Sequence, residues 1–171
     1  RSFLSIFICK MSVHIHCLPS VIELVKKSGY PGMKILQFAF DSREESDYLP
    51  HNYTHNCVVY TGTHDNDTVM GWYDTLKGAD KKLCDDYLRL KNADGEPIPR
   101  EQLPWEFVRA AMSSVADLAI IPMQDYLGLG SEARINIPST LGINWKWRMG
   151  NGDFTKELAG RIRSMTKLYG R

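Results

Sequence analysis

The stretch Cys57-Val-Val-Tyr-Thr-Gly-Thr-His-Asp-Asn-Asp-Thr68 passes directly from a short apolar run into a cluster of polar and acidic side chains. Residues 57–61 predict a β-strand, and the polar residues after them predict the loop at its carboxyl end. Runs that are nearly continuous in apolar residues suit parallel strands buried on both faces of a sheet. Both α/β barrels and open α/β sheets place their chemistry at the carboxyl ends of such strands. The stretch therefore predicts an α/β fold with a candidate site immediately after this strand.

Two more runs have the same form. Residues 33–40 are strand-like and end at Asp41, and residues 118–123 are strand-like and end at Gln124 and Asp125. Three strands cannot close a barrel, and a (β/α)8 barrel typically needs about 250 residues. The 171 residues of this chain therefore fit either a small open sheet or the last part of a barrel. The strand-like runs alone do not decide between the two.

Helical segments are expected between and after these runs. Ser20 and Glu23 have the spacing of a capping box and predict a short helix over residues 21–27. Asp67 or Thr68 is expected to cap the helix that follows the central cluster. Further helix faces are predicted from apolar residues spaced three or four apart, at Leu83, Tyr87 and Leu90, at Val108, Ala111, Met112 and Val115, and at Leu158, Ile162, Met165 and Tyr169.

The composition is that of an ordinary globular domain, with 43% hydrophobic residues, 24% charged residues and a formal net charge of +1. This charge gives no electrostatic reason to expect nucleic acid or an anionic membrane as partner. No apolar run approaches the roughly 20 residues that span a bilayer. The chain begins with Arg1, and no signal-peptide cleavage site follows, so we expect a truncated chain. Reduced thiols of a cytosolic protein are expected at the widely spaced Cys9, Cys17, Cys57 and Cys84.

The cluster Thr63–Thr68 has two interpretations. Asn and Asp favour turns and helix N-caps, which accounts for Asp67. His64 and Asp65 are harder to explain as a turn, because the strand end would aim both side chains at the mouth of the sheet. Together they suit a metal-dependent hydrolase. They equally suit glycosyl transfer, in which the carboxylate stabilises an oxocarbenium-like transition state and the histidine donates to a sugar hydroxyl.

The metal interpretation needs further ligands at strand ends. Asp41 and Asp125 are available there, but a second strand-end histidine is not. Neither a phosphate-binding glycine loop nor a nucleophile elbow occurs in the sequence. Aromatic side chains that either stack on sugar rings or pack in the core are Trp72, Tyr73, Trp105, Trp145 and Trp147.

The central cluster also carries a resemblance to a known family. Residues 58–68 closely resemble a motif of the 4-α-glucanotransferases, also called amylomaltases or disproportionating enzymes. Residues 32–40 are similar to the preceding barrel strand of that family, and residues 119–138 and 144–148 resemble its C-terminal signature. The resemblance runs from about Ser20 to the end of the chain. It implies an α/β fold that is the C-terminal portion of a (β/α)8 TIM barrel, roughly its last three strands with their helices.

The resemblance implies roles for particular residues. Asp65 matches the family's transition-state-stabilising aspartate and is therefore expected to be catalytic. His64 and Asn136 are expected to contact the substrate, and Gln124 and Asp125 to line the cleft. The implied reaction transfers an α-1,4-glucan segment to a new 4-hydroxyl with retention of configuration, without metal or organic cofactor.

The partners implied are α-1,4-glucans and maltooligosaccharides, with glucose as an acceptor, and neither nucleic acid nor membrane. The implied location is the cytoplasm, or the plastid if the source is a plant.

The resemblance also leaves gaps. A retaining mechanism needs a nucleophilic carboxylate and a general acid/base about 5 Å apart. The family's nucleophile lies on an earlier strand, and its acid/base glutamate would precede the helix near Val21, where residues 12–19 contain no carboxylate. Residues 1–19 resemble nothing in the family and are expected to be disordered or artefactual, beside a partial barrel domain over residues 20–171.

We therefore expect the 171-residue polypeptide to be inactive by itself. Two other functions remain open: a non-catalytic α-glucan-binding remnant, and a metal-dependent hydrolase that uses His64 and Asp65.

Overall fold

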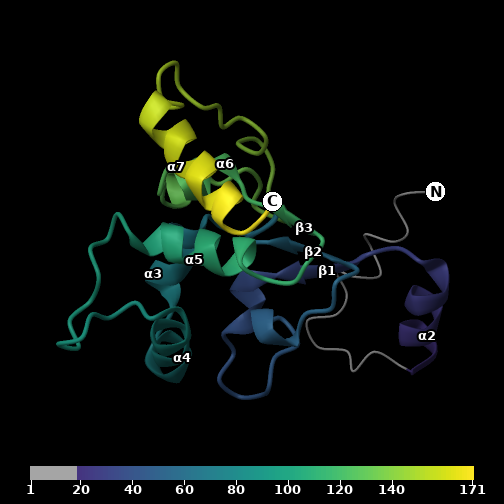
Figure 1. The fold of residues 1–171 in the computed structure, drawn as a ribbon. Helices are drawn as coiled ribbons and strands as arrows, with labels where there is room; N and C mark the ends of the chain where they lie inside the picture. The colour runs from purple at the N-terminus through teal and green to yellow at the C-terminus, as the bar shows by residue number, and fades with distance from the viewer. Residues whose placement is uncertain (1–18) are drawn as a thin grey trace.

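The computed structural model describes residues 19–171, and the predictions for residues 1–18, including those for Cys9 and Cys17, lie outside this range. A parallel three-stranded sheet in the order β1-β2-β3 forms the centre (Figure 1). Its strands are β1 (Gly32–Ile35), β2 (Cys57–Tyr60) and β3 (Leu118–Ile120). In the register, Val58 of β2 lies opposite Met33 of β1 and Leu118 of β3. The predicted α/β class with parallel strands is confirmed.

Two strand predictions were wrong in part. The run 33–40 leaves the sheet after Ile35, because residues 36–39 form the 3-10 helix η2 (Leu36–Ala39). A continuous apolar run does not distinguish a strand from a buried helical turn, and Leu36 and Ala39 are fully buried in η2. Strand β3 is shorter than predicted and is not buried on both faces, since Leu118 and Ile120 are exposed. Leu118 and Ile120 are two residues apart and point to the same face of the sheet, whereas Ala119 between them packs against buried core residues on the other face.

The helices lie largely where the apolar spacing predicted them. They are α2 (Pro19–Ser28), α3 (Val69–Thr75), α4 (Gly78–Leu88), α5 (Leu103–Met112), α6 (Met123–Tyr126) and α7 (Lys156–Leu168), with short 3-10 helices η3 (Pro50–Asn52) and η4 (Ser131–Ala133). Thr68 caps α3, because its side chain accepts a hydrogen bond from the backbone N–H of Gly71. Val115 lies beyond the end of α5 and is exposed, so its predicted place on the helix face was wrong.

Helix α5 is the centre of the packing. On one side, Phe107 is fully buried and its ring contacts the rings of Phe40, Trp72 and Tyr73 at centroid distances of 6.1, 5.8 and 6.3 Å. On the other side, α7 packs against the buried cluster of α5 through its predicted apolar face, Leu158, Ile162, Met165 and Tyr169. Helix α2 lies apart from the other helices (Figure 1).

The thiols of Cys57 and Cys84 are free, as predicted, and both are buried. Among the helices of residues 19–171, none combines the length and the apolar composition that a membrane crossing requires.

Candidate active site

The predicted site lies in the turn that connects β2 to α3. Within this turn, Asn66 makes a local hydrogen-bonded loop: its Oδ1 accepts from the backbone N–H and the hydroxyl of Thr63 at 2.9 and 2.7 Å. The backbone N–H of Asn66 in turn donates to the carbonyl oxygen of Thr63 at 3.0 Å. Asn is favoured in such turns because its side chain bonds to nearby backbone. His64 and Asp65 therefore stand on a closed turn that begins at the carboxyl end of β2.

His64 and Asp65 lie against one another at the tip of this turn. Nε2 of His64 is 3.2 Å from Oδ1 of Asp65, and the two side chains are 45% and 20% exposed. The carboxylate is thus mostly shielded from water, whereas nearly half of the surface of the His64 side chain is exposed to solvent. Because a charge in a shielded site acts more strongly on its neighbours than one in water, this arrangement suits electrostatic stabilisation of a bound cationic centre.

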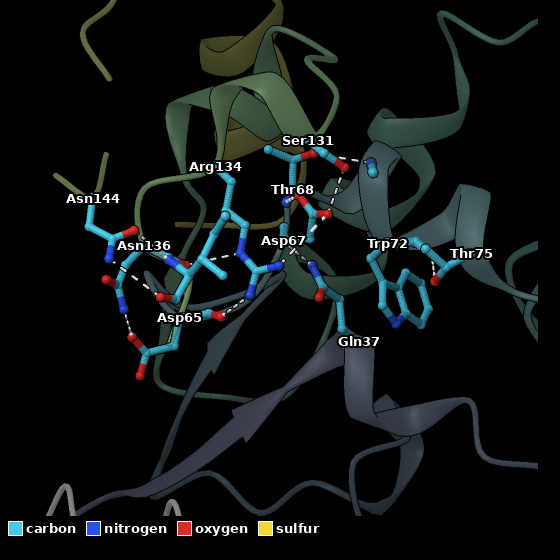
Figure 2. Close-up of polar contacts among 12 residues, drawn as sticks. Gln37, Asp65, Asp67, Thr68, Trp72, Thr75, Ser131, Arg134, Asn136 and Asn144 are labelled. Carbon is cyan, nitrogen blue, oxygen red and sulfur yellow. Dashed lines mark hydrogen bonds and ion pairs between the residues drawn. The ribbon is translucent and has the colours of Figure 1, made fainter. Parts of the chain in front are cut away.

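A distant segment of the chain closes over Asp65. Nδ2 of Asn136 donates to Oδ1 of Asp65 at 2.6 Å, and the guanidinium of Arg134 donates to the backbone carbonyl of Asp65 at 2.7 Å. Arg134 also donates through Nε to the carbonyl oxygen of Asn136 at 2.9 Å, so the two residues hold each other (Figure 2). The loop after η4 therefore fixes both the carboxylate and the backbone of Asp65.

The same loop brings an indole ring to His64. The ring of Trp145 lies 5.1 Å from the ring of His64, tilted by 36°, and the side chain of Trp145 is 56% exposed. Its backbone has a φ of 65°, a left-handed conformation that is unfavourable for a bulky residue. The backbone N–H of Trp145 donates to the carbonyl oxygen of Ile135 at 2.7 Å, which holds the loop in this conformation.

Asp67 serves the structure of the turn. One carboxylate oxygen accepts from the hydroxyl of Ser131 at 2.6 Å, and the other accepts from the backbone N–H of Thr68 at 2.8 Å. The side-chain amide of Gln37 donates to the backbone carbonyl of Asp67 at 2.9 Å (Figure 2). The bond to Thr68 is the local turn role that was predicted, whereas the bond to Ser131 joins the start of α3 to η4 and was not predicted.

Gln124 and Asp125 are only 3% and 1% exposed, so they do not line an open cleft in this structure. The carboxylate of Asp125 accepts from the hydroxyl of Thr61 at 2.5 Å and from the backbone N–H of Val69 at 2.8 Å. Gln124 donates to the carbonyl oxygen of Ala133 at 3.1 Å. Burial raises the pKa of Asp125 to about 6, against the lowering effect of its two hydrogen bonds. The prediction that both residues lie at the end of the strand was wrong, because β3 ends at Ile120 and both residues belong to helix α6, with their side chains turned inward.

Of the five residues expected at the site, the structure brings three into contact: His64, Asp65 and Asn136. The sequence reasoning missed Arg134, which holds the backbone of Asp65, although a cation two residues before Asn136 was a usable signal. Among the candidate stacking residues, Trp72, Tyr73 and Trp105 pack in the core, whereas Trp145 lies at the site. Within residues 19–171, no group of three or more His, Cys, Asp or Glu side chains is arranged to hold a metal ion.

A family model, related sequences and a solved structure all match this chain to the family that its motif resembles. Residues 16–153 match the family model described as 4-alpha-glucanotransferase. The chain is 49% identical to the 4-alpha-glucanotransferase of Clostridium butyricum over 151 residues, and 46% identical to the chloroplastic/amyloplastic 4-alpha-glucanotransferase of Arabidopsis thaliana over 154 residues. Each alignment covers 88% of this chain. Among solved structures, the amylomaltase from Streptococcus agalactiae in complex with acarbose matches with a TM-score of 0.80 and 34% identity over 92% of this chain.

The matched segment is a limited part of each relative. The chain covers 30% of the Clostridium protein, 26% of the Arabidopsis protein and 31% of the Streptococcus chain. The segment that aligns includes the turn after β2, η4 and the loop that carries Asn136.

Proposed function

This chain belongs to the 4-alpha-glucanotransferase family, and from that membership we propose that it serves the transfer of α-1,4-glucan segments to a new 4-hydroxyl acceptor with retention of configuration. Asp65 is the catalytic carboxylate in this proposal, and His64 and Asn136 are the residues beside it that meet the sugar. The donors are α-1,4-glucans and maltooligosaccharides, and glucose serves as an acceptor. The bound acarbose in the Streptococcus agalactiae structure, a maltooligosaccharide analogue, supports this class of ligand.

The observation that carries the proposal is the fixed position of the Asp65 carboxylate. Its Oδ1 receives the amide of Asn136 at 2.6 Å and lies 3.2 Å from the imidazole of His64. A carboxylate held in this way does not need to reorganise when positive charge develops on a nearby sugar ring. Retaining glycosyl transfer passes through such an oxocarbenium-like state.

We propose further that residues 20–171 are the C-terminal part of a (β/α)8 barrel. The parallel order of β1, β2 and β3 supports this, as does the placement of the site after the carboxyl end of β2. For a plant source we propose the plastid, since the Arabidopsis protein is named chloroplastic/amyloplastic, and for a bacterial source we propose the cytoplasm.

The resemblance implies that neither the family's nucleophile nor its general acid/base is among the residues of this chain that match its motifs. We therefore expect the purified 171-residue polypeptide to release no glucose from maltotriose. The function is tested in a hybrid protein, in which residues 20–171 replace the matching segment of the Streptococcus agalactiae amylomaltase. This hybrid should convert maltotriose into glucose and longer maltooligosaccharides, equally with and without EDTA.

Loss of transfer in a hybrid that is folded by circular dichroism would refute the proposal. Activity that EDTA removes would instead favour the metal-dependent hydrolase. Binding of acarbose by the 171-residue polypeptide without any transfer in the hybrid would indicate a glucan-binding role alone.

A further inference from the structure

Two neighbouring residues of α6, Gln124 and Asp125, form hydrogen bonds to the two segments that make up the site, and neither takes part in the proposed chemistry. Asp125 is fully buried, and its two carboxylate oxygens bind the two ends of the turn that carries Asp65. One oxygen accepts from the hydroxyl of Thr61, directly after β2, at 2.5 Å. The other accepts from the backbone N–H of Val69, the first residue of α3, at 2.8 Å. One carboxylate therefore closes the base of the whole turn.

Gln124, the residue before Asp125, anchors the second segment of the site, the loop that carries Arg134 and Asn136. Nε2 of Gln124 is buried and donates to the carbonyl oxygen of Ala133, the last residue of η4, at 3.1 Å. Arg134 and Asn136, which hold Asp65, follow directly after this anchored carbonyl. Both partners of the hydrogen bond between Asn136 and Asp65 are thus tied to consecutive residues of one short helix.

The anchor itself is well fixed. Helix α6 follows β3 within a few residues and contacts α5, the central helix of the core. The backbone N–H of Asp125 donates to the carbonyl oxygen of Pro122 at 3.0 Å. The surroundings leave little free space, since a Cβ added at Gly62 would stand 2.6 Å from the amide nitrogen of Gln37.

From this geometry we propose that Asp125, together with Gln124, is a positioning residue that sets where the Asp65 carboxylate stands relative to Asn136. Asp125 acts through the backbone and through Thr61 and does not touch the substrate. The inference rests on the proposed role of Asp65 for its catalytic meaning, but the arrangement it describes is measurable without any activity. If the hybrid protein shows no transfer activity, the positioning of Asp65 by Asp125 can still be tested on the 171-residue chain. If that positioning test fails, the proposed transfer function is unaffected.

The test uses the 171-residue chain and the side-chain amide signal of Asn136 in ¹⁵N NMR spectra, assigned by its disappearance in Asn136→Asp. In the unmodified chain this signal should be displaced from that of a free asparagine amide, because Nδ2 donates to a carboxylate. Asp125→Ala should move the signal toward the free value. Asp125→Asn should largely restore it, since an amide oxygen can still accept from Val69 and its NH₂ can donate to Thr61.

A matched control separates positioning from general loss of stability. Asp85 is a buried aspartate of α4 that accepts a hydrogen bond from the hydroxyl of Tyr73 at 2.7 Å. Asp85→Ala should lower stability while the Asn136 signal stays in place. An unchanged Asn136 signal in Asp125→Ala, or an equal displacement in Asp85→Ala, would overturn the proposal.

If Asp125→Ala does not fold, Thr61→Val decides the question. This change removes one of the two bonds to the Asp125 carboxylate and leaves the bond to Val69. A partial displacement of the Asn136 signal supports the proposal, and no displacement refutes it.

Discussion

The ionisation of Asp125 should leave a distinct mark on how the stability of the chain depends on pH. Burial of this carboxyl raises its pKa from 3.8 to about 6, and the negative charge of Asp67 acts in the same direction. Between pH 4 and pH 6 the folded chain therefore keeps a proton on Asp125 that the unfolded chain has already lost. The free energy of unfolding consequently falls as the pH rises through this window.

The size of the effect follows from the two pKa values. A difference of one pKa unit corresponds to about 1.4 kcal/mol, so raising the pKa from 3.8 to about 6 lowers the stability by about 3 kcal/mol between pH 3.5 and pH 7. Because Asp125 is only 1% exposed, solvent screening does not reduce this figure appreciably. Asp74, Asp80 and Asp86 have lowered pKa values, so their opposite contributions fall below pH 4.

The assay is urea denaturation, followed by tryptophan fluorescence at half-unit steps from pH 4 to pH 7, of the unmodified chain and of Asp125→Asn. The variant cannot ionise at this position and keeps the neutral hydrogen-bonding pattern, so the other carboxyl groups contribute equally to both proteins. The stability of the unmodified chain relative to the variant should fall by about 2.5 kcal/mol between pH 4 and pH 7, because the unfolded chain has already lost part of its proton at pH 4. Parallel pH profiles for the two proteins would refute the reasoning, because the carboxyl would then have its ordinary pKa in the folded chain.

Three further substitutions should lower the free energy of unfolding by amounts that follow from the contacts they remove or crowd, and each is measured by urea denaturation. Phe107→Ala should cost about 3–5 kcal/mol because the ring is fully buried among aromatic neighbours, whereas Phe154→Ala, at a ring that is 51% exposed, should change stability by less than about 0.5 kcal/mol; equal losses would show that the core is placed wrongly. Gly71→Ala would put a Cβ 2.2 Å from the hydroxyl oxygen of Ser131, so it should lower stability by about 1–3 kcal/mol. Alanine favours helix more than glycine does, so a rise in stability would contradict this close contact. Thr155→Ala removes the acceptor for the backbone N–H of Leu158 at the start of α7 and should cost about 1 kcal/mol; Thr155→Ser should keep most of that stability.

The sequence was sufficient for the parts of the fold that depend on local pattern. The apolar runs predicted all three strands, and the spacing of Leu158, Ile162, Met165 and Tyr169 predicted the face of α7 that packs on α5. The end of β1 was not predictable in this way, because Leu36 and Ala39 are as well buried in a 3-10 turn as they would be in a strand. An apolar run therefore indicates which residues are buried, but it does not indicate whether a strand or a helical turn buries them.

The candidate site shows the same division. The cluster after β2 located His64 and Asp65, and resemblance to a family motif added Asn136, which donates to the carboxylate of Asp65. The role of Asp125 depends on contacts with residues 64 and 56 positions earlier in the chain. The apolar run predicted this carboxyl at a strand end, whereas the structure places it in helix α6 with its side chain turned inward.

The central claim is that Asp65 stabilises the charge that develops on the transferred sugar, and the most direct measurement is kcat for maltotriose disproportionation by the hybrid protein with Asp65→Asn. Asparagine keeps the size of the side chain and removes its charge. The account predicts that kcat falls by about 100-fold or more, with KM little changed, since the lost interaction matters mainly in the transition state. In the same hybrid, Asp94→Asn, at an exposed position between α4 and α5, should leave kcat unaltered. A kcat for Asp65→Asn within a few-fold of the unmodified hybrid would contradict the assignment of Asp65.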